Sequence, residues 1–377
     1  MTEDASTLRV LLTVHHDLTE GTGAAGSTLA LAAELERRGH TVEVVGSELL
    51  VRRHGATFDA LAFPHAVARR VGDRLARGVD VVDASTGDLA YVGAERVRRA
   101  PSAVFTRSHG LEHLNAARRK EGARRGELRL RHRYYAYHGG IRLWEVARSL
   151  RVADAALLLN DTEASYAVEE LGVAVRRIHR TSELLRDLPP ASSPADRRGV
   201  LVLSPESWRK GADVATRVLE VLLRSSPTAT ASWHGLSDPS SIRTQLGSDV
   251  RDRVVLGGSY DAAALASLLA GHRVLLFASR AEGLGMTVLE ALAAGLPVVA
   301  SDVPGPRDIL AGGQGGVLVP DGHVEGMATA LRRLLADDAR RVELAERGRA
   351  RAATYQTVPV VDRLESSYRE VLALKRR

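Results

Sequence analysis

Short apolar segments alternate with helix-like segments along almost the whole chain, and this alternation constrains the fold more than any other feature. Most of the apolar segments are continuous runs of Val, Leu and Ala, as expected for strands buried on both faces. Strands that alternate with helices form parallel, doubly wound sheets, so we predict an α/β protein. The expected strands are residues 8–14, 40–46, 79–85, 102–108, 154–160, 199–204, 228–234, 253–258, 273–279, 297–301 and 316–320.

The segment RDLPPASSPADRR breaks this rhythm with Pro, Ser and charged residues. A chain of 377 residues is also too long for one ordinary domain. We therefore predict a Rossmann-like domain over 1–187, a linker over 188–198 and a second Rossmann-like domain over 199–359. Because ligands of open parallel sheets bind at the carboxyl ends of the strands, the ligand is expected in a cleft between the two domains.

The composition excludes several classes of site. The chain has no cysteine, which rules out disulfides, thiolate metal sites and a cysteine nucleophile. The stretch MTEDASTLRVLLTV lacks the basic region and apolar run of a signal peptide. No apolar run approaches the ~18 residues of a membrane-spanning helix. We expect a soluble, cytoplasmic protein.

One basic segment accounts for the positive charge of the chain. Residues 118–133 hold eight basic and two acidic side chains, and their net charge of +6 equals that of the whole chain. Three interpretations are open: a solvated surface, an acceptor-side segment that orders on binding, and a peripheral contact with an anionic membrane. The alternation of Leu with Arg129 and Arg131 favours the acceptor-side segment, and His15 and His16 are further acceptor-side candidates. Nucleic-acid binding is not expected, because an excess of arginine over lysine is typical of a GC-rich genome.

Residues 21–26, GTGAAG, fit the G-x-G-x-x-G pattern of a phosphate-binding turn. A nicotinamide dinucleotide site is one interpretation, with Glu48 as the acidic residue that holds a ribose, and a plain loop is another. The segment HHDLTE separates the pattern from the preceding strand, which makes the loop longer than the dinucleotide fingerprint allows. We favour a loop whose backbone N–H groups, at Gly21, Thr22 and Gly23, approach a phosphate held by the other domain.

The strongest motif lies in the second predicted domain: SRAEGLGMTVLEALAAGLPVVASDVPGPRDIL, residues 279–310. A buried strand is followed by a glycine-containing loop and a helix, which Gly295 ends in the left-handed conformation. The free N–H groups at a helix start form an anion site. The candidate donor-binding residues of the loop and helix start are Gly283, Leu284, Gly285, Met286 and Thr287.

Two carboxylates stand in this motif. Glu290, one turn into the helix, can accept two hydrogen bonds from a vicinal diol such as a ribose. Glu282 lies in the loop and is expected at the mouth of the cleft, among sugar hydroxyls.

This stretch resembles the donor-site signature of the retaining glycosyltransferases of family 4, which have the GT-B fold. Their pattern resembles E-G-x-G-x-x-x-x-E-A-x-A-x-G-x-P-V-[IV], and here two glutamates also flank seven residues. The resemblance implies a GT-B architecture, with two Rossmann-like domains that face a central cleft. It also implies that Glu290 holds the nucleotide ribose and that Glu282 binds the donor sugar at the catalytic centre.

Other segments extend the resemblance. TRSHGLEH looks like the family's T-x-H-G-x stretch, which implies a place for His109 at the catalytic centre. RKGAD resembles the segment whose lysine contacts the donor diphosphate, which implies that role for Lys210. The GTGAAG loop is similar to the family's N-terminal glycine loop. The end of the chain looks like the family's last helix, so a helix over 360–377 is expected to pack back on the first domain.

Two departures from the family pattern stand out. The usual G-R-L-x-x-x-K-G is SPESWRKG here, so Pro205 stands where the family has its phosphate arginine, and Arg209 is the candidate substitute. The usual V-x-N-G is missing, and RRIHRTSELLRD, residues 176–187, stands in its place with no explanation from the sequence.

The resemblance implies a bacterial enzyme that transfers a sugar, with retention, from a nucleoside-diphosphate sugar. UDP and GDP are the expected nucleotides, and the acceptor is a small molecule, a glycan or a glycolipid precursor. No cofactor or metal is expected, because cations and N–H dipoles can stabilise the leaving diphosphate and no D-x-D stands near a strand end. The alternatives are an epimerase or phosphorylase on this fold, or a non-catalytic sugar-nucleotide-binding protein.

Overall fold

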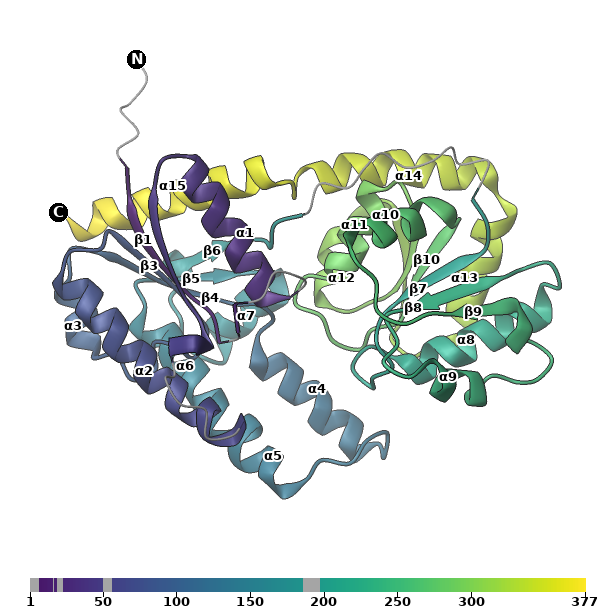
Figure 1. The fold of residues 1–377 in the computed structure, drawn as a ribbon, viewed down its shortest axis with the longest axis horizontal. Helices are drawn as coiled ribbons and strands as arrows, with labels where there is room; N and C mark the ends of the chain where they lie inside the picture. The colour runs from purple at the N-terminus through teal and green to yellow at the C-terminus, as the bar shows by residue number, and fades with distance from the viewer. Residues whose placement is uncertain (1–6, 16, 19–22, 50–55, 186–196) are drawn as a thin grey trace, which may run out of the picture. The chain divides into compact units, whose positions relative to one another are not determined.

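The computed structural model describes residues 7–15, 17–18, 23–49, 56–185 and 197–377. The chain divides into two compact units, each built on its own parallel sheet (Figure 1). The first unit comprises Met1–Leu184 and Thr357–Arg377, and the second comprises Leu185–Gln356.

The first unit has a six-stranded sheet in the order β2-β1-β3-β4-β5-β6, in which every paired strand is parallel to its neighbour. Its strands are β1 (Arg9–Thr13), β2 (Thr41–Val45), β3 (Val81–Ser85), β4 (Ala103–Arg107), β5 (Ala155–Leu158) and β6 (Ile178–Arg180). Its helices are α1 (Ala24–Arg37), α2 (Ala56–Ala76), α3 (Ala94–Arg99), α4 (Glu112–Arg124), α5 (His132–Ala136), α6 (Arg142–Val152), α7 (Asp161–Glu169) and α15 (Thr357–Lys375). Shorter turns are the 3-10 helices Ser47–Leu49 and Val175–Arg177 and the π-helix Tyr137–Ile141.

Successive residues of these strands enter opposite cores, because side chains alternate across a sheet. Val10 and Leu12 of β1 pack on one face with α1 and α15, two helices that lie side by side in Figure 1. Leu11, between them, packs on the other face with α2 and α3. Both faces are covered, which explains why the strands read as continuous apolar runs.

The second unit has the sheet order β12-β11-β10-β7-β8-β9, again parallel throughout. Its strands are β7 (Val200–Leu203), β8 (Ala231–His234), β9 (Val254–Leu256), β10 (Val274–Phe277), β11 (Val298–Ser301) and β12 (Gly316–Val319). Its helices are α8 (Ala212–Ser225), α9 (Pro239–Gln245), α10 (Ala262–Gly271), α11 (Met286–Ala293), α12 (Pro304–Leu310), α13 (Val324–Ala336) and α14 (Asp338–Ala353), with 3-10 turns at Arg251–Arg253 and Ala311–Gly313. Its largest hydrophobic core lies where α8 and α13 pack on the sheet, around Trp233 of β8.

The structure confirms the α/β class and each strand expected from the sequence, with ends that differ by at most three residues. The strand β6 was not predicted, and it lies inside the segment 176–187 that departs from the family pattern. Most of the expected linker lies outside the described residues. Its last two residues, Arg197 and Arg198, are part of the second unit: buried Arg197 donates to the carbonyl groups of Ala294 and Gly295 at 2.7 and 2.6 Å.

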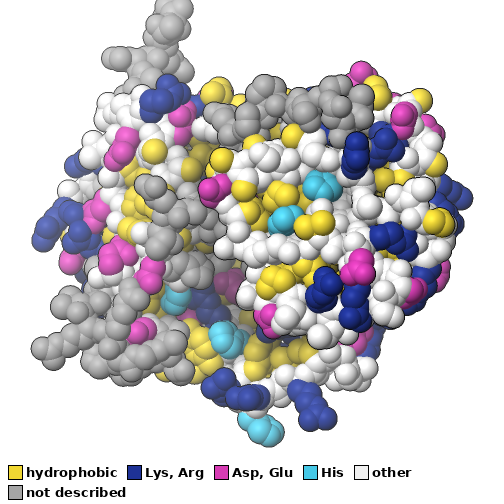
Figure 2. Space-filling model, turned by 45° about the vertical axis from the view of Figure 1, so that its right-hand side comes forward, with side chains coloured by type: hydrophobic (Ala, Val, Ile, Leu, Met, Phe, Trp, Pro, Cys, Tyr) yellow, Lys and Arg dark blue, Asp and Glu magenta, His cyan; other side chains and the backbone are white. Residues whose placement is uncertain are grey.

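The basic segment 118–133 starts in α4 and continues through a turn into α5. Arg118 and Arg125 both pair with Glu121 on the same helix. On the face drawn in Figure 2, basic and acidic side chains also lie close together in many places. Of the helices in the described part of the chain, none is long and apolar enough to span a bilayer.

Candidate functional site

The strand orders point to one ligand-binding edge in each unit. An open parallel sheet binds ligands where neighbouring strands lead away in opposite directions, at their carboxyl ends. That position lies between β1 and β3 in the first unit and between β7 and β10 in the second. The candidate donor residues Arg209 and Lys210 follow β7, and the motif that contains Glu282 follows β10.

The segment after β7 is fixed directly onto the segment after β10. Gly211 has a φ of +69°, and a Cβ at this position would lie 1.9 Å from the carbonyl oxygen of Ala278. Two residues earlier, the carbonyl of Arg209 accepts a hydrogen bond from the N–H of Arg280 at 2.8 Å. The backbone of the RKG sequence therefore lies against the donor motif, which places the side chains of both segments at the same edge.

The side chain of Arg280 also connects the segment after β7 with the segment after β10. Its buried guanidinium donates two hydrogen bonds to Asp213, at 2.6 and 2.7 Å, and one to the carbonyl of Trp208 at 2.9 Å. It also lies over the Trp208 ring, 5.0 Å from the centroid. Burial raises the pKa of Asp213, but the hydrogen bonds and charge of Arg280 outweigh it and lower that pKa. Arg280 thus joins the two loops by a bidentate ion pair.

Lys210 and Arg209 converge on Glu282. The Nζ atom of Lys210 lies 2.5 Å from Oε1 of Glu282, and Nη1 of Arg209 lies 3.5 Å from the same oxygen. Only about a tenth of the Glu282 side chain is exposed, whereas Arg209 is 39% exposed. A largely buried carboxylate therefore pairs with two cations, one of which is Arg209, the expected substitute for the family arginine.

The loop after β10 leads into α11 through strained backbone that glycine accommodates. Gly285 has a φ of +94° and precedes Met286, the first residue of the helix, which no side chain caps. Met286 and Thr287 are half-buried. The backbone of Gly305 packs closely against this loop. A Cβ at Gly305 would lie only 2.2 Å from the carbonyl oxygen of Leu284, so a larger residue would not fit there. An uncapped, partly shielded helix start is a favourable place for an anionic group.

Glu290 lies in the following turn of α11 and is only 5% exposed. After α11, Gly295 has a φ of +65°, the left-handed conformation expected at this helix end. Gly283, earlier in the loop, is half-buried. The structure therefore places all the candidate donor residues of this motif on one loop and one helix.

Gly211→Ala is expected to destabilise the second unit strongly. The change adds a left-handed non-glycine residue and a backbone clash, which together cost about 2–4 kcal/mol. Gly312→Ala is the matched control, because Gly312 has a φ of +67° and nothing within 4 Å of its Cβ position. Thermal unfolding should show a clearly larger fall in midpoint for Gly211→Ala. Equal falls would mean that the contact with Ala278 does not hold the two loops together.

The first unit places part of the predicted glycine loop at the start of α1. Gly21, Thr22 and His16 lie outside the described residues. Gly23 precedes α1 with a φ of +91°, and no side chain caps the helix. Glu48, the acidic residue of the dinucleotide interpretation, accepts a hydrogen bond from the N–H of Gly46 at 2.7 Å.

His109 follows β4 and lies between two polar partners. Its Nδ1 atom is 2.7 Å from Oε1 of Glu183, and its Nε2 atom is 3.2 Å from Oγ of Ser85. Ser85 donates its one hydrogen to the carbonyl of Thr13 at 2.9 Å. Since the Glu183 carboxylate is also an acceptor, and accepts from Ser27 as well, both ring nitrogens of His109 must donate.

The charges around His109 agree with this assignment. Burial lowers the pKa of His109, but the neighbouring Glu183 carboxylate outweighs burial and raises it. Burial raises the pKa of Glu183, but His109, Ser27 and Arg107 outweigh that effect and lower it. The geometry and the electrostatics therefore both indicate an imidazolium–carboxylate pair.

A buried cluster of polar side chains connects β4, the strand that precedes His109, with β3 and α15. Arg107, at the end of β4, makes a bidentate ion pair with Asp83 of β3. Tyr368 of α15 donates to the same carboxylate. Arg107 also donates to Thr181 at 3.3 Å, which ties β4 to the segment that carries Glu183.

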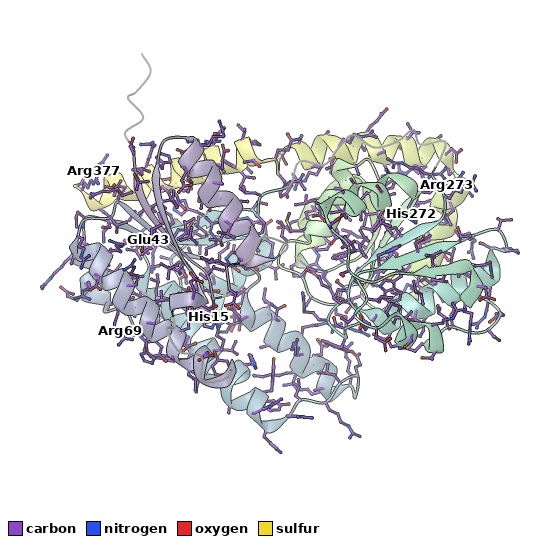
Figure 3. All side chains as sticks on the ribbon, viewed as in Figure 1. His15, Glu43, Arg69, His272, Arg273 and Arg377 are labelled. Atoms are coloured by element: carbon purple, nitrogen blue, oxygen red, sulfur yellow. The ribbon has the colours of Figure 1, made fainter. Side chains whose placement is uncertain are left out.

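The acceptor-side candidates lie on two different connecting segments of the first unit. His15 follows β1 and is labelled in Figure 3, and its Nδ1 atom lies 3.5 Å from the buried carboxylate of Asp88. Arg129 and Arg131 are exposed, in the connection between α4 and α5. Among the described residues, no three His, Asp or Glu side chains are grouped so that they could hold a metal ion.

Sequence reasoning missed several residues that shape these edges. Glu183, which pairs with His109, stands in the segment where the family's V-x-N-G was expected. That departure was the only signal for it. Asp88 and Asp83 lie in no motif, and Arg280 lies in the donor motif without an expected role, because the contacts of all three are with residues that are distant along the chain.

Comparison with known proteins places the second unit in a family. Residues 198–337 match the model of Glycosyl transferases group 1. Alpha-D-kanosaminyltransferase of Streptomyces kanamyceticus is 27% identical over 244 residues, which cover 60% of this chain and 63% of that protein. Phosphatidyl-myo-inositol mannosyltransferase of Mycolicibacterium smegmatis is 34% identical over 164 residues, 43% of this chain and 42% of that protein. The chain thus matches less than two thirds of the length of each.

Solved structures show the same architecture over nearly the whole chain. Sucrose-phosphate synthase from Thermosynechococcus elongatus has a TM-score of 0.72 at 19% identity, with 97% of this chain and 99% of that chain covered. HepE from Anabaena, solved in complex with UDP and glucose, has a TM-score of 0.65 at 18% identity, with 97% and 99% covered. The likeness confirms the predicted GT-B fold, within which residues 198–337 match the family Glycosyl transferases group 1.

Proposed function

We propose that this chain is a retaining glycosyltransferase that moves a sugar from a nucleoside-diphosphate sugar to a hydroxyl-bearing acceptor. The observation that carries the proposal is the convergence of Lys210 and Arg209 on Glu282 at the ligand-binding edge of a glycosyltransferase-family domain. UDP and GDP are the nucleotides we favour, and a resident metal or cofactor is not part of the proposal. We infer a bacterial enzyme, which the two bacterial relatives support, and we expect it in the cytoplasm.

The second unit supplies what departure of a diphosphate requires. Negative charge develops on the leaving oxygen, and fixed cations and N–H dipoles in a shielded site stabilise it. Lys210 and Arg209 provide the cations, and the uncapped start of α11 at Met286 provides N–H groups. In the free chain Glu282 holds both cations at this edge.

The first unit supplies the group expected beside the transferred sugar. His109 presents a fixed, cationic ring through its contacts with Glu183 and Ser85. Transfer requires this histidine and the donor residues to act on one sugar. In our proposal the leaving phosphate helps to deprotonate the acceptor on the same face, which retains the anomeric configuration and needs no protein nucleophile. The segment 118–133 is left out of the proposal, since its local ion pairs favour a solvated surface.

Glu290→Ala tests the proposal at the ribose. Loss of a charged hydrogen-bond acceptor is expected to weaken nucleotide binding by about 1–3 kcal/mol. Isothermal titration of UDP and GDP into the wild-type chain and the variant measures this effect. Glu325→Ala is the matched control, because Glu325 is an exposed glutamate in the first turn of α13.

Binding of a nucleoside diphosphate by the wild-type chain that is weakened in Glu290→Ala and unchanged in Glu325→Ala supports the assignment. Unchanged affinity in Glu290→Ala contradicts the ribose role, and failure of the wild-type chain to bind any nucleoside diphosphate contradicts the function. Release of free nucleotide without an acceptor would favour an epimerase, and dependence on phosphate would favour a phosphorylase.

A further inference from the structure

We propose that Asp88, Glu145, His15 and Arg142 form an acceptor subsite in the first unit, and that it selects an acceptor with an amino group beside its hydroxyls. The inference rests on the proposed function and names the acceptor class for it. Asp88 and His15 follow β3 and β1, the two strands between which a ligand of this sheet is expected.

Four buried polar atoms in this cluster have no hydrogen-bond partner in the described structure: Oδ1 of Asp88, Oε2 of Glu145, Nδ1 of His15 and Nη1 of Arg142. Asp88 and Glu145 are both completely buried. Their nearest basic atoms lie beyond hydrogen-bond distance: Nδ1 of His15 is 3.5 Å from Oδ1 of Asp88, and Nη1 of Arg142 is 3.6 Å from Oε2 of Glu145. Because buried polar atoms are satisfied in the great majority of cases, this group of four points to a missing ligand.

The other oxygen of each acid is held firmly. Oδ2 of Asp88 accepts from the hydroxyl of Thr13 at 2.6 Å, and Oε1 of Glu145 accepts from the hydroxyl of Tyr91 at 3.1 Å. Each carboxylate is therefore oriented by the protein and presents its second oxygen to the cluster. That arrangement is preorganised for a ligand that donates hydrogen bonds.

The charge balance favours a cationic ligand. Arg142 donates to Glu112 at 2.9 Å and to the carbonyl of Thr86 at 2.6 Å, so this one guanidinium faces Asp88, Glu112 and Glu145. Burial raises the pKa of Glu145, although Arg142 partly opposes it. Three carboxylates therefore face one arginine and one histidine, so the acidic side chains of the cluster outnumber the basic ones. An ammonium group would balance them, and a phosphate would add to the repulsion.

The edge of the cluster suits a sugar-like ring. About a quarter of the side chains of His15 and Glu112 is exposed, so these two residues line the way in. Tyr91, which donates to Glu145, has its ring 5.8 Å from that of Trp144, and Trp144 is half exposed. Aromatic faces with a few convergent polar groups are the usual composition of small-molecule sites.

A chain of hydrogen bonds connects this cluster to His109. Thr13 donates its hydroxyl to Asp88, and its carbonyl accepts from Ser85, whose oxygen lies 3.2 Å from Nε2 of His109. An acceptor held by Asp88 would therefore share one hydrogen-bond network with the histidine expected beside the transferred sugar.

Three probes of matched shape test the subsite: glucosamine, glucose and glucose 6-phosphate. Ligand-observed NMR titration of the full chain, at a pH where the amine is protonated, measures their affinities. We expect glucosamine to bind at least about tenfold more tightly than glucose, as a charge-assisted hydrogen bond allows, and glucose 6-phosphate to bind most weakly. Equal affinities for glucosamine and glucose would overturn the proposal.

Asp88→Asn and Glu145→Gln should each reduce the preference for glucosamine, because both remove a negative charge and keep the shape. Glu170→Gln is the matched control, since it removes an exposed carboxylate at the end of α7. Circular dichroism checks that each variant folds. If Asp88→Asn does not fold, Glu145→Gln alone decides the test, because its amide oxygen can still accept from Tyr91. An unchanged preference in a folded variant would overturn the subsite.

Titration with UDP and GDP separates this inference from the proposed function. If a nucleoside diphosphate binds and the amine preference is absent, the subsite is wrong and the function stands. If neither nucleotide binds, the function fails, and with it the assignment of this cluster to an acceptor.

Discussion

His109→Ala is expected to fold, to bind nucleotide normally and to lose at least about 100-fold in kcat, the low end for a catalytic group. The ring is held by Glu183 and Ser85, so its removal leaves the edge of the sheet intact but without its fixed cation. Steady-state kinetics with a transferable acceptor, together with UDP titration, measures both quantities. Wild-type turnover in this variant would contradict a catalytic role for His109.

The pH profile of Glu183→Gln tests whether His109 acts as a cation. Glu183 raises the pKa of His109, so its neutral replacement should lower that pKa. If the imidazolium is the active form, activity is lost as pH rises through the pKa of His109. The alkaline limb of the profile should then move to lower pH in Glu183→Gln. Movement of an acid limb instead would mean that the neutral ring is the active form.

A control for this profile is available in the same unit. Glu170→Gln removes an exposed carboxylate and should leave the alkaline limb unchanged. Direct titration of the His109 ring by NMR gives a second readout. A pKa that stays the same in Glu183→Gln would show that the pair does not control the charge of His109.

The architecture could be predicted well because most strands are recognisable from their own short stretch of sequence. A strand buried on both faces is expected to be apolar along its whole length, and β5, β7 and β10 all show this pattern. The strand β6 is short and only half buried, with a histidine and an arginine among its three residues. Such a strand is defined by its partner β5 rather than by its own sequence, which explains why it was missed.

The site could be predicted only where one segment carries several of its members. The loop and helix from Glu282 to Glu290 form a continuous motif, and the structure keeps these residues together. Glu183 and His109 are 74 positions apart, and no local pattern links them. The same holds for Asp88 and Thr13, whose contact depends on the parallel pairing of β1 with β3. Tertiary packing brings such groups together, so the sequence alone did not reveal them.

Lys210→Gln is expected to lower kcat by about 100- to 1000-fold, as loss of one group that stabilises a developing anion does. It should also weaken UDP binding by at least about tenfold, because a charged hydrogen bond to phosphate is lost. Arg217→Gln is the matched control: it removes an exposed cation that pairs with Asp213 on α8. Kinetics and UDP titration of both variants measure the difference.

Glu282→Gln should separate phosphate binding from catalysis at the same contact. In the free chain the Glu282 carboxylate pairs with Lys210 and, more weakly, with Arg209, and it competes with any incoming diphosphate. Its neutral replacement releases these cations, so UDP should bind as tightly as before or more tightly. Turnover should still fall, because the carboxylate expected to bind the donor sugar is gone. Lys210→Gln and Glu282→Gln thus share a loss of kcat and differ in nucleotide affinity. Parallel losses of affinity would mean that Glu282 supports the diphosphate site through Lys210 and makes no separate contact with the sugar.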